Sequence, residues 1–419
     1  MTRSLILNPV IRGQGGADPR RKLEEAVGLA QAIDLDAVEC ASIQLDKPHP
    51  ATLLGSGKVD EIAATIRQGD IELAIVNAAL TPVQQRNLER AWKAKVLDRT
   101  GLILEIFGRR AQTREGVMQV DLAHLTYQKS RLVRSWTHLE RQRGGAGFMG
   151  GPGERQIESD RRILDEKITR LRRQLEKVVR TRSLHRAARK RAPYPVVVLV
   201  GYTNAGKSTL FNRLTEAKVL AADMLFATLD PTMREIKLPS GRMTILSDTV
   251  GFISDLPTEL VAAFRATLEE VIEADLIVHV RDISSPDSAT EARDVLAVLD
   301  TIGVSDDIPI IEVLNKIDAL AEPLDPSDLR DDDGCERFAV SALTGAGCDA
   351  LVRMIEDRVY PDSQEVSLKL RHKDGAALSW LYDHGVVSDR ADTDTHVTIR
   401  AWMTRKEYAQ FKKEFSGNI

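Results

Sequence analysis

Two motifs that follow apolar runs carry residues suited to binding a nucleoside triphosphate, and the first is a glycine-rich loop. The apolar run 196–200 predicts a buried strand, and Gly201-x-x-x-x-Gly206-Lys207-Ser208 follows it before an amphipathic helix pattern. In such a loop, backbone N–H groups converge on phosphate oxygens, the lysine places a cation between the β- and γ-phosphates, and the serine hydroxyl ligates Mg²⁺. The predicted phosphate-binding residues are Gly201, Tyr202, Thr203, Asn204, Ala205, Gly206, Lys207, Ser208 and Thr209.

The second motif, Asp248-Thr249-Val250-Gly251, follows a strand pattern that begins at residue 243. Asp248 can hold Mg²⁺ through water, and the Gly251 N–H can bond the γ-phosphate. The polar-aromatic segment 223–232 is suited to ordering around that phosphate, with Thr228 as the second Mg²⁺ hydroxyl and Thr232 as the alternative. Loss of the phosphate would free both segments, which makes a two-state switch. The residues predicted to bind nucleotide here are Phe226, Ala227, Thr228, Leu229, Asp230, Asp248, Thr249, Val250 and Gly251.

Base identity is predicted by Asn315-Lys316-Ile317-Asp318, at the end of the apolar strand pattern 309–315. The Asp318 carboxylate can accept hydrogen bonds from N1–H and the exocyclic amino group of guanine, a donor pair that adenine lacks. The Lys316 stem can cover the base, and backbone N–H groups after the strand at 338–340 can serve guanine O6. The predicted base-binding residues are Asn315, Lys316, Asp318, Ser341, Ala342 and Leu343, and the ligands are therefore GTP and GDP.

Phe252 occupies the position where many GTPases carry a glutamine that orients the attacking water. A phenylalanine cannot orient water by hydrogen bonding, so no catalytic side chain is assigned. One hypothesis is a K⁺ ion held by Asn204 near the bridging phosphates, where charge develops; the alternative is that Asn204 only shapes the loop. A second hypothesis is that a bound partner completes the site.

The flanking sequence divides into four predicted domains. Residues 1–112 alternate strand patterns (4–7, 37–45, 73–77, 95–98) with helix patterns (19–33, 58–68, 82–92), which predicts an α/β domain with a parallel sheet. Residues 53–58, "LLGSGK", read as a turn before a helix, because the complete phosphate-loop pattern is absent. The predicted GTP-binding domain spans 193–362 with a mostly parallel sheet. Residues 363–419 predict a small α+β domain in the order β-α-β-β-α.

Residues 113–192 predict an antiparallel helical hairpin. Apolar heptads run from Met118 to Leu139 and from Leu164 to Val178, on either side of a glycine-rich loop at 144–153. From residue 109 to residue 191 there are 22 Lys and Arg against 9 Asp and Glu, in a chain whose overall charge is −4. This excess favours RNA as a partner; the alternatives are a solvated helix face and a flexible connector. The RNA-binding candidates are Arg141, Arg143, Gly144, Gly145, Gly150, Gly151 and Arg155.

The composition sets the cellular context that we expect. The three cysteines have no metal-ligand spacing, which favours a reducing compartment. No apolar run reaches the length of a membrane span. We expect a cytoplasmic, monomeric protein without membrane insertion.

Several of these segments resemble the motifs of one family, the HflX GTPases. They are "DRTGLILEIFGRRAQTREG" (98–116), "GPGERQIESDRR" (151–162), "GYTNAGKSTLFNRLTEA" (201–217), "LFATLDPT" (225–232) and "DTVGFISDLP" (248–257). The resemblance covers nearly the whole chain. It implies a GTP hydrolase that binds the large ribosomal subunit and its rRNA, and that splits or rescues stalled ribosomes under stress.

Two functions of other classes compete with this interpretation. One is a GTP-gated RNA-binding module or chaperone with little hydrolysis of its own, with which Phe252 is equally compatible. The other is a phosphotransferase or ATPase that uses the same phosphate loop, and Asp318 argues against it. The sequence by itself does not separate a GTPase from a GTP-gated binding module.

Overall fold

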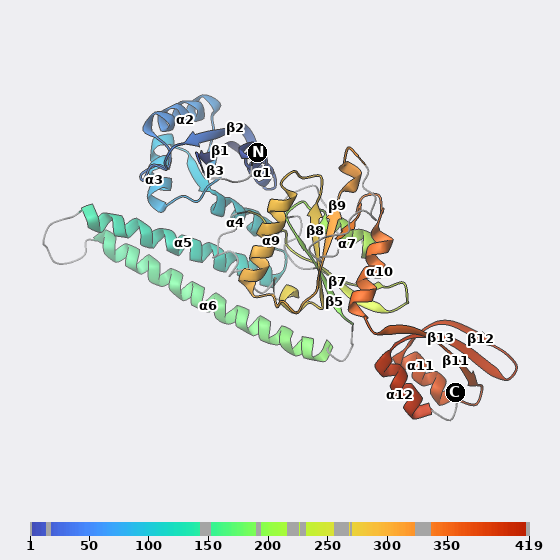
Figure 1. Cartoon of the computed structure of the whole chain (residues 1–419). Helices are drawn as coiled ribbons and strands as arrows, with labels where there is room; N and C mark the ends of the chain where they lie inside the picture. Colours follow the sequence, from blue (N-terminus) through green and yellow to red (C-terminus); the bar gives the residue numbers. More distant parts are fainter. Residues whose placement is uncertain are drawn as a thin grey trace.

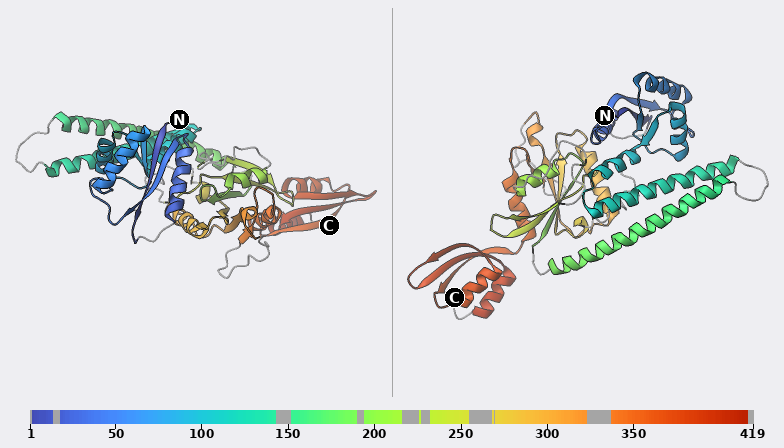
Figure 2. Two further views of the ribbon diagram at one scale, coloured as in Figure 1. Left: turned by 90° about the horizontal axis from the view of Figure 1, so that it is seen from above. Right: turned by 180° about the vertical axis from the view of Figure 1, so that it is seen from behind.

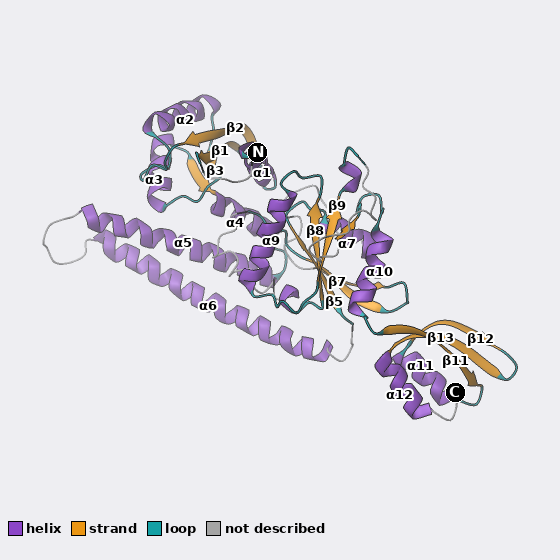
Figure 3. Ribbon diagram, viewed as in Figure 1, coloured by secondary structure: helices purple, strands orange, loops and turns teal. Residues whose placement is uncertain are grey.

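The chain forms four parts that follow one another along the sequence (Figure 1, Figure 2). The structure is a computed structural model, and it describes residues 2–13, 18–142, 152–189, 194–215, 226, 232–254, 268, 270–322 and 337–415. Helices cover the faces of the first two sheets and one face of the third (Figure 3). The α/β class with a mostly parallel central sheet is confirmed. Among the described residues, no helix combines the length and the apolar character needed to cross a bilayer.

The first part is a parallel four-stranded sheet in the order β2-β1-β3-β4. Its core is apolar on both faces, with Leu5 and Ile6 on opposite sides of β1 and both almost fully buried. The predicted start of the third helix is present as a capping box between Thr81 and Gln84. The elements are β1 (Arg3–Ile11), α1 (Pro19–Gln31), β2 (Asp36–Leu45), α2 (Ser56–Gly69), β3 (Leu73–Val76), α3 (Pro82–Trp92) and β4 (Lys95–Asp98).

A helix that the strand-and-helix pattern did not predict, α4 (Arg99–Arg110), follows β4 directly. Its Leu102, Ile103, Ile106 and Phe107 are buried. They join an apolar cluster that also contains Val200 and Phe252 of the third part. Most of its surface is buried because it packs in this one cluster, which the first and third parts share, and Glu105 and Arg109 lie on its exposed side.

The second part is the predicted hairpin, with α5 (Arg114–Gln142) antiparallel to α6 (Pro152–Arg189) (Figure 1). Met118 and Ile168 of the predicted heptads are buried, and Lys129 of α5 pairs with Asp165 of α6. Beyond that stripe, α5 buries Val120 and Ala123 in the same cluster as α4. The first turns of α5 are therefore packed on two faces, whereas the heptad pattern predicted only one.

The third part is a six-stranded sheet in the order β10-β9-β8-β5-β7-β6, parallel except that β6 is antiparallel to β7. The chain adds strands on one side of β5 and then on the other, which places a crevice at the carboxyl end of β5. The elements are β5 (Val196–Gly201), α7 (Lys207–Thr215), β6 (Thr232–Lys237), β7 (Met243–Asp248), β8 (Leu276–Asp282), α9 (Ser288–Ile302), β9 (Ile310–Asn315), a 3₁₀ turn η1 (Ile317–Ala319), β10 (Arg337–Ala339) and α10 (Cys348–Val359).

The fourth part has the predicted β-α-β-β-α order. Its elements are β11 (Ser363–Arg371), α11 (Gly375–His384), β12 (Val386–Asp392), β13 (His396–Thr404) and α12 (Arg405–Phe415). The antiparallel sheet has the order β11-β13-β12, and Trp380 and Phe411 pack in its core with their ring centroids 5.4 Å apart. This part contacts the third through Arg242, whose guanidinium lies 4.6 Å from the centre of the Tyr360 ring and 3.6 Å from the Glu407 carboxylate.

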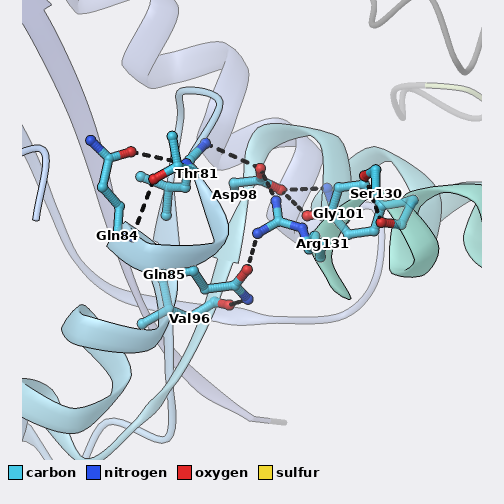
Figure 4. Close-up of polar contacts among 10 residues, drawn as sticks. Thr81, Gln84, Gln85, Val96, Asp98, Gly101, Ser130 and Arg131 are labelled. Carbon is cyan, nitrogen blue, oxygen red and sulfur yellow. Dashed lines mark hydrogen bonds and ion pairs between the residues drawn. The ribbon is translucent and has the colours of Figure 1, made fainter. Parts of the chain in front are cut away.

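A buried carboxylate, Asp98, joins the first part to the hairpin (Figure 4). Its side chain, in a residue 1% exposed, accepts hydrogen bonds from the Gly101 N–H (2.8 Å) and the Leu80 N–H (3.2 Å). From α5, Tyr127 donates its hydroxyl at 2.5 Å and Arg131 forms an ion pair with the same carboxylate. Asp98 therefore caps α4, holds the turn before α3 and fixes the direction in which α5 leaves the domain.

We predict that Asp98→Ala destabilises the protein by about 3–5 kcal/mol, because it removes a buried hub of four hydrogen bonds and leaves the half-buried Arg131 charge without its carboxylate partner. The measurement is urea unfolding of the full chain, followed by a probe in the first part. The matched control is Asp46→Ala, which removes an ion pair to Arg12 whose two side chains are 81% and 70% exposed. The control should change stability little; equal effects of the two substitutions would contradict the role given to Asp98.

Candidate nucleotide site

The glycine-rich loop lies at the carboxyl end of β5, in the crevice where the strand order reverses. Two glycines are required there by close contacts. A Cβ on Gly201 would lie 2.1 Å from the Val280 carbonyl oxygen, and one on Gly206, with φ +90°, would lie 2.2 Å from Asn315 Nδ2. Gly206 also has a left-handed backbone, which favours glycine. The loop thus passes close to β8 and to the base motif, and α7 begins at Lys207 with its N-terminus toward the crevice.

Lys207 is the buried cation of the loop. Its Nζ donates to the carbonyl oxygens of Gly201 (3.1 Å) and Tyr202 (2.8 Å). Burial lowers the pKa of Lys207 to about 8, and the Asp248 carboxylate opposes this effect. A bound triphosphate would add negative charge and favour the protonated form. Backbone carbonyls therefore hold the Lys207 ammonium in a place where phosphate oxygens can replace them as its hydrogen-bond acceptors.

The two predicted Mg²⁺ positions adjoin each other. Ser208 Oγ donates to Asp248 Oδ2 at 2.7 Å, and Asp248 is fully buried. A hydroxyl and a carboxylate are the hard oxygen ligands that Mg²⁺ accepts, directly or through water. The residues present therefore fit a nucleotide-bound Mg²⁺, which would neutralise charge on the β- and γ-phosphates. Thr228, predicted as its second hydroxyl ligand, lies outside the described residues; the alternative, Thr232, is the first residue of β6, paired with Asp248.

The Asp248–Gly251 segment turns two of its side chains away from the crevice. The Thr249 hydroxyl donates to the Leu199 carbonyl at 2.7 Å, and Val250 packs in the core. Their side chains are structural, so only their backbone can meet a phosphate. Gly251 lies against the loop, since a Cβ there would be 2.9 Å from Thr203 Cα and 3.0 Å from Lys207 Nζ.

Phe252 is 2% exposed and belongs to the apolar cluster shared with α4. Its backbone forms a parallel bridge with Tyr202: the Thr203 N–H donates to the Phe252 carbonyl at 2.7 Å, and the Phe252 N–H donates to the Gly201 carbonyl at 3.1 Å. The ring is therefore directed into the core, and the backbone of this residue is tied to the phosphate loop.

The side-chain amide of Asn315 connects the base motif to the phosphate loop. Asn315 Nδ2 donates to the Ala205 carbonyl (2.8 Å), and Asn315 Oδ1 accepts from the Ala342 N–H (2.9 Å). Asp318 is exposed on η1, and its carboxylate accepts from Ser341 Oγ at 2.5 Å. The structure thus brings the phosphate loop, the 315–318 motif and residues 341–343 together around one site, although the loop lies more than a hundred residues before the other two in sequence.

Two side chains near the base motif were missed by the sequence reading. Asp282, the last residue of β8, pairs with Lys316 at 2.7 Å, so the lysine stem is held in place. Arg213 of α7 donates to the carbonyl oxygens of Ala342, at 2.9 Å, and Leu343. The signal for Asp282 was present, since it ends an apolar strand. Nothing in the sequence pattern marked Arg213.

Within the segment predicted to surround the γ-phosphate, 223–232, the structure describes only Phe226 and Thr232. Phe226 is the informative one. This residue is 2% exposed, and its ring packs edge-on against Phe107 of α4, with centroids 4.8 Å apart. Its side chain therefore contacts the first part of the chain rather than solvent. Ala227, Leu229 and Asp230 lie outside the described residues.

The RNA-binding candidates lie at or beyond the ends of the hairpin helices. Arg141 is in the last turn of α5 and Arg155 in the first turn of α6, at the tip that points away from the third part (Figure 1). Arg143, Gly144, Gly145, Gly150 and Gly151 lie outside the described residues.

A third feature missed by the sequence reading is the contact between the first part and the residues after Phe252. Arg99, 6% exposed, donates to the Ser254 carbonyl (2.9 Å), to Glu25 (2.7 Å) and to Asn77 (2.6 Å). Arg21 of α1 donates to Asp287 and Ser285 at 3.3 Å each. The first part therefore contacts the third through ion pairs as well as through the apolar cluster.

For the base pocket, we predict that Asp318→Asn reduces the preference for guanine by roughly 100-fold, because two hydrogen bonds to a charged acceptor are lost. Competition between GTP and ATP or XTP for a fluorescent GDP analogue measures the preference. The matched control is Asp306→Asn, which changes an exposed carboxylate in the loop before β9. An unchanged preference in Asp318→Asn would show that another group reads the base.

Sequence models of four protein families match consecutive stretches of the chain. They are the N-terminal (residues 20–108) and middle (110–189) regions of GTP-binding GTPases, the 50S ribosome-binding GTPase (196–316) and the HflX C-terminal domain (330–418). The matches follow one another in the order of the four parts, and the last of them begins at residue 330, so it includes β10 and α10 of the third part.

The relatives are similar over most of their length. The GTPase HflX of Magnetococcus marinus is 50% identical over 91% of this chain and 87% of its own length, and that of Escherichia coli is 42% identical over 94% and 92%. A GTP-binding protein of Sulfolobus solfataricus, solved with GDP, is 24% identical with a TM-score of 0.46, covering 86% of this chain and 99% of that one. The phosphate loop, the buried Asp248 and the guanine motif lie in one site of a P-loop GTP hydrolase, and the chain belongs to the HflX family of GTPases.

Proposed function

We propose that the chain is a GTP-driven switch of the large ribosomal subunit, which uses GTP binding and hydrolysis to split or rescue stalled ribosomes under stress. It would act as a monomer in the cytoplasm, where ribosomes are. GTP with Mg²⁺ would occupy the site around Lys207, Ser208 and Asp248, and the rRNA would be contacted by the basic hairpin.

The observation that carries the proposal is the continuous packing between the nucleotide site and the hairpin. Phe226, in the segment predicted to surround the γ-phosphate, packs on Phe107 of α4, and α4 packs on α5. Asp98, at the start of α4, is bonded to Tyr127 and Arg131 of α5. A change at the γ-phosphate therefore has a physical route to the arm, because packed cores are bistable rather than continuously deformable.

The arm has the charge that an RNA partner requires. Described arginines such as Arg161, Arg162 and Arg172 are exposed on α6, while Ile168 faces the partner helix. Each arginine that neutralises a phosphate releases counterions, so this surface favours RNA in a salt-dependent way. The description of the matched GTPase family as 50S ribosome-binding supports the large subunit as the RNA.

We predict that the chain sediments with large ribosomal subunits at least about 5-fold more tightly with a non-hydrolysable GTP analogue than with GDP. Replacing Arg141, Arg143 and Arg155 by Gln should weaken binding and lower the slope of log affinity against log salt by about 3, one for each phosphate contact. Equal affinities for the large subunit with GDP and with the GTP analogue would contradict the proposed switch.

The matched control removes three arginines outside the hairpin, one in α10 and two in the fourth part. Arg353, Arg390 and Arg400 are exposed, and their replacement by Gln makes the same change in net charge. If this variant lost as much affinity and salt slope as the hairpin variant, binding would depend on overall charge and not on the arm.

For hydrolysis, we propose that K⁺ held by Asn204 supplies part of the catalysis, since the buried ring of Phe252 cannot orient water as a glutamine at this position would. Asn204 is exposed, with a left-handed backbone (φ 61°), a conformation that Asn adopts more readily than most residues. Asn204→Gly is therefore an informative variant, because glycine readily adopts the same backbone conformation and lacks the side-chain amide.

We predict that turnover in K⁺ buffer exceeds turnover in Na⁺ buffer by about 10-fold or more, the size of effect expected for charge stabilisation in the transition state. In Asn204→Gly the two rates should be similar. Equal rates in the wild-type protein would remove the K⁺ proposal, and a K⁺ response that survives in Asn204→Gly would leave Asn204 a role only in loop shape.

The burial of Phe252 equally favours a second candidate, a GTP-gated RNA-binding module with little hydrolysis. Single-turnover measurements in K⁺ with ribosomal subunits present distinguish the two. GTP that stays intact over the lifetime of the complex would favour the module.

A further inference from the structure

The second residue of the phosphate loop, Tyr202, directs its hydroxyl away from the phosphate-binding backbone and toward Ser254. The Ser254 N–H donates to the Tyr202 hydroxyl at 2.9 Å, and the two hydroxyls are 2.8 Å apart. Ser254 Oγ donates to Asp294 Oδ2 of α9 at 2.9 Å. A serine hydroxyl can donate one hydrogen bond, and Ser254 donates its own to Asp294. The Tyr202 hydroxyl is therefore the donor in the bond between the two hydroxyls.

This chain of hydrogen bonds continues the backbone pairing of the same two segments. Tyr202 and Phe252 form a parallel bridge, and the Tyr202 side chain reaches two residues further along to Ser254. The segment after Gly251 is thus held at Phe252 by backbone bonds and at Ser254 by a side chain. Gly251 lies just before the bridge, in contact with Thr203 and Lys207.

The surroundings keep the Tyr202 hydroxyl neutral. Burial and the nearby Glu25 carboxylate raise the pKa of Tyr202, with the hydrogen bond from the Ser254 N–H and the charge of Arg99 acting in the opposite direction. The hydroxyl is therefore protonated at neutral pH and able to donate. Buried polar networks of this kind fix one geometry when every member has a partner.

We propose that Tyr202 is a positioning residue of GTP hydrolysis, whose hydroxyl holds Ser254 and so keeps Gly251 and Phe252 in register against the phosphate loop. Because Phe252 stands in place of the usual glutamine, the side chain directly after Gly251 cannot align the reacting groups, and a fixed backbone there gains importance. The role goes beyond the phosphate contact expected of a loop residue. It rests on the GTPase activity of the family and not on the ribosomal function proposed above.

The test is single-turnover hydrolysis by the full chain in K⁺ buffer without ribosomes, with protein in excess over GTP. Tyr202→Phe keeps the ring and removes the hydroxyl. We expect its hydrolysis rate to fall about 10-fold while the affinities for GTP and GDP stay within about 2-fold, since a group that aligns the reacting geometry affects the chemical step and not uniform binding. Ser254→Ala should give a similar loss, and the double variant should be no slower than Tyr202→Phe, because the two changes remove one linkage.

Other outcomes overturn the proposal. They are an unchanged or faster rate in Tyr202→Phe, a parallel loss of rate and affinity, and additive losses in the double variant. Tyr408→Phe, in α12 of the fourth part, is the control for losing a tyrosine hydroxyl and should leave the rate unchanged. If Tyr202→Phe does not fold, Asp294→Asn weakens the same linkage from α9 without touching the phosphate loop, and its rate and affinity are then decisive. Because ribosomes are absent, failure of the ribosomal proposal would not affect these results.

Discussion

The parallel bridge between Tyr202 and Phe252 is the interaction on which the rest of the site depends. It joins the phosphate loop to the segment after Asp248 through two backbone hydrogen bonds, 2.7 Å and 3.1 Å long. Gly251 can approach Thr203 and Lys207 only because it has no Cβ. The Asp248 carboxylate, the Ser208 hydroxyl and the Lys207 ammonium are thereby brought into one small volume, where their charges interact with little screening by water.

The same bridge determines the direction of the Phe252 side chain. With its backbone paired to the loop, its ring enters the apolar cluster that contains Val200, Phe107 and Phe226. That cluster belongs to the nucleotide-binding part and to the first part at once. Burial of apolar surface is not directional, so the cluster alone would allow the two parts to slide. Arg99 and Arg21 add the directional contacts, to Ser254 and to Asp287, that define one arrangement.

The hairpin follows from a similar combination of apolar and polar contacts. The heptad stripe holds α5 and α6 together, but it does not say where the arm points. Asp98 fixes that direction, because its carboxylate accepts bonds from β4–α4, from the turn before α3 and from α5. A buried carboxylate with four partners (Figure 4) is costly to disrupt, and these bonds therefore fix the direction of the arm.

The sequence by itself determined the α/β class, the phosphate loop, the guanine motif, the hairpin and the order of strands and helices along the fourth part. Each depends on short-range information: periodicity, capping residues, or glycines at fixed spacing followed by Lys207 and Ser208. Only the tertiary structure decided that Thr249 and Val250 turn into the core, that Tyr202 reaches Ser254, and that α4 packs in a cluster shared by the first and third parts. These outcomes depend on residues distant in sequence, such as Phe107 beside Phe226 and Arg99 beside Ser254. Local propensity carries no record of such neighbours, because the packing that selects them exists only once the chain has folded.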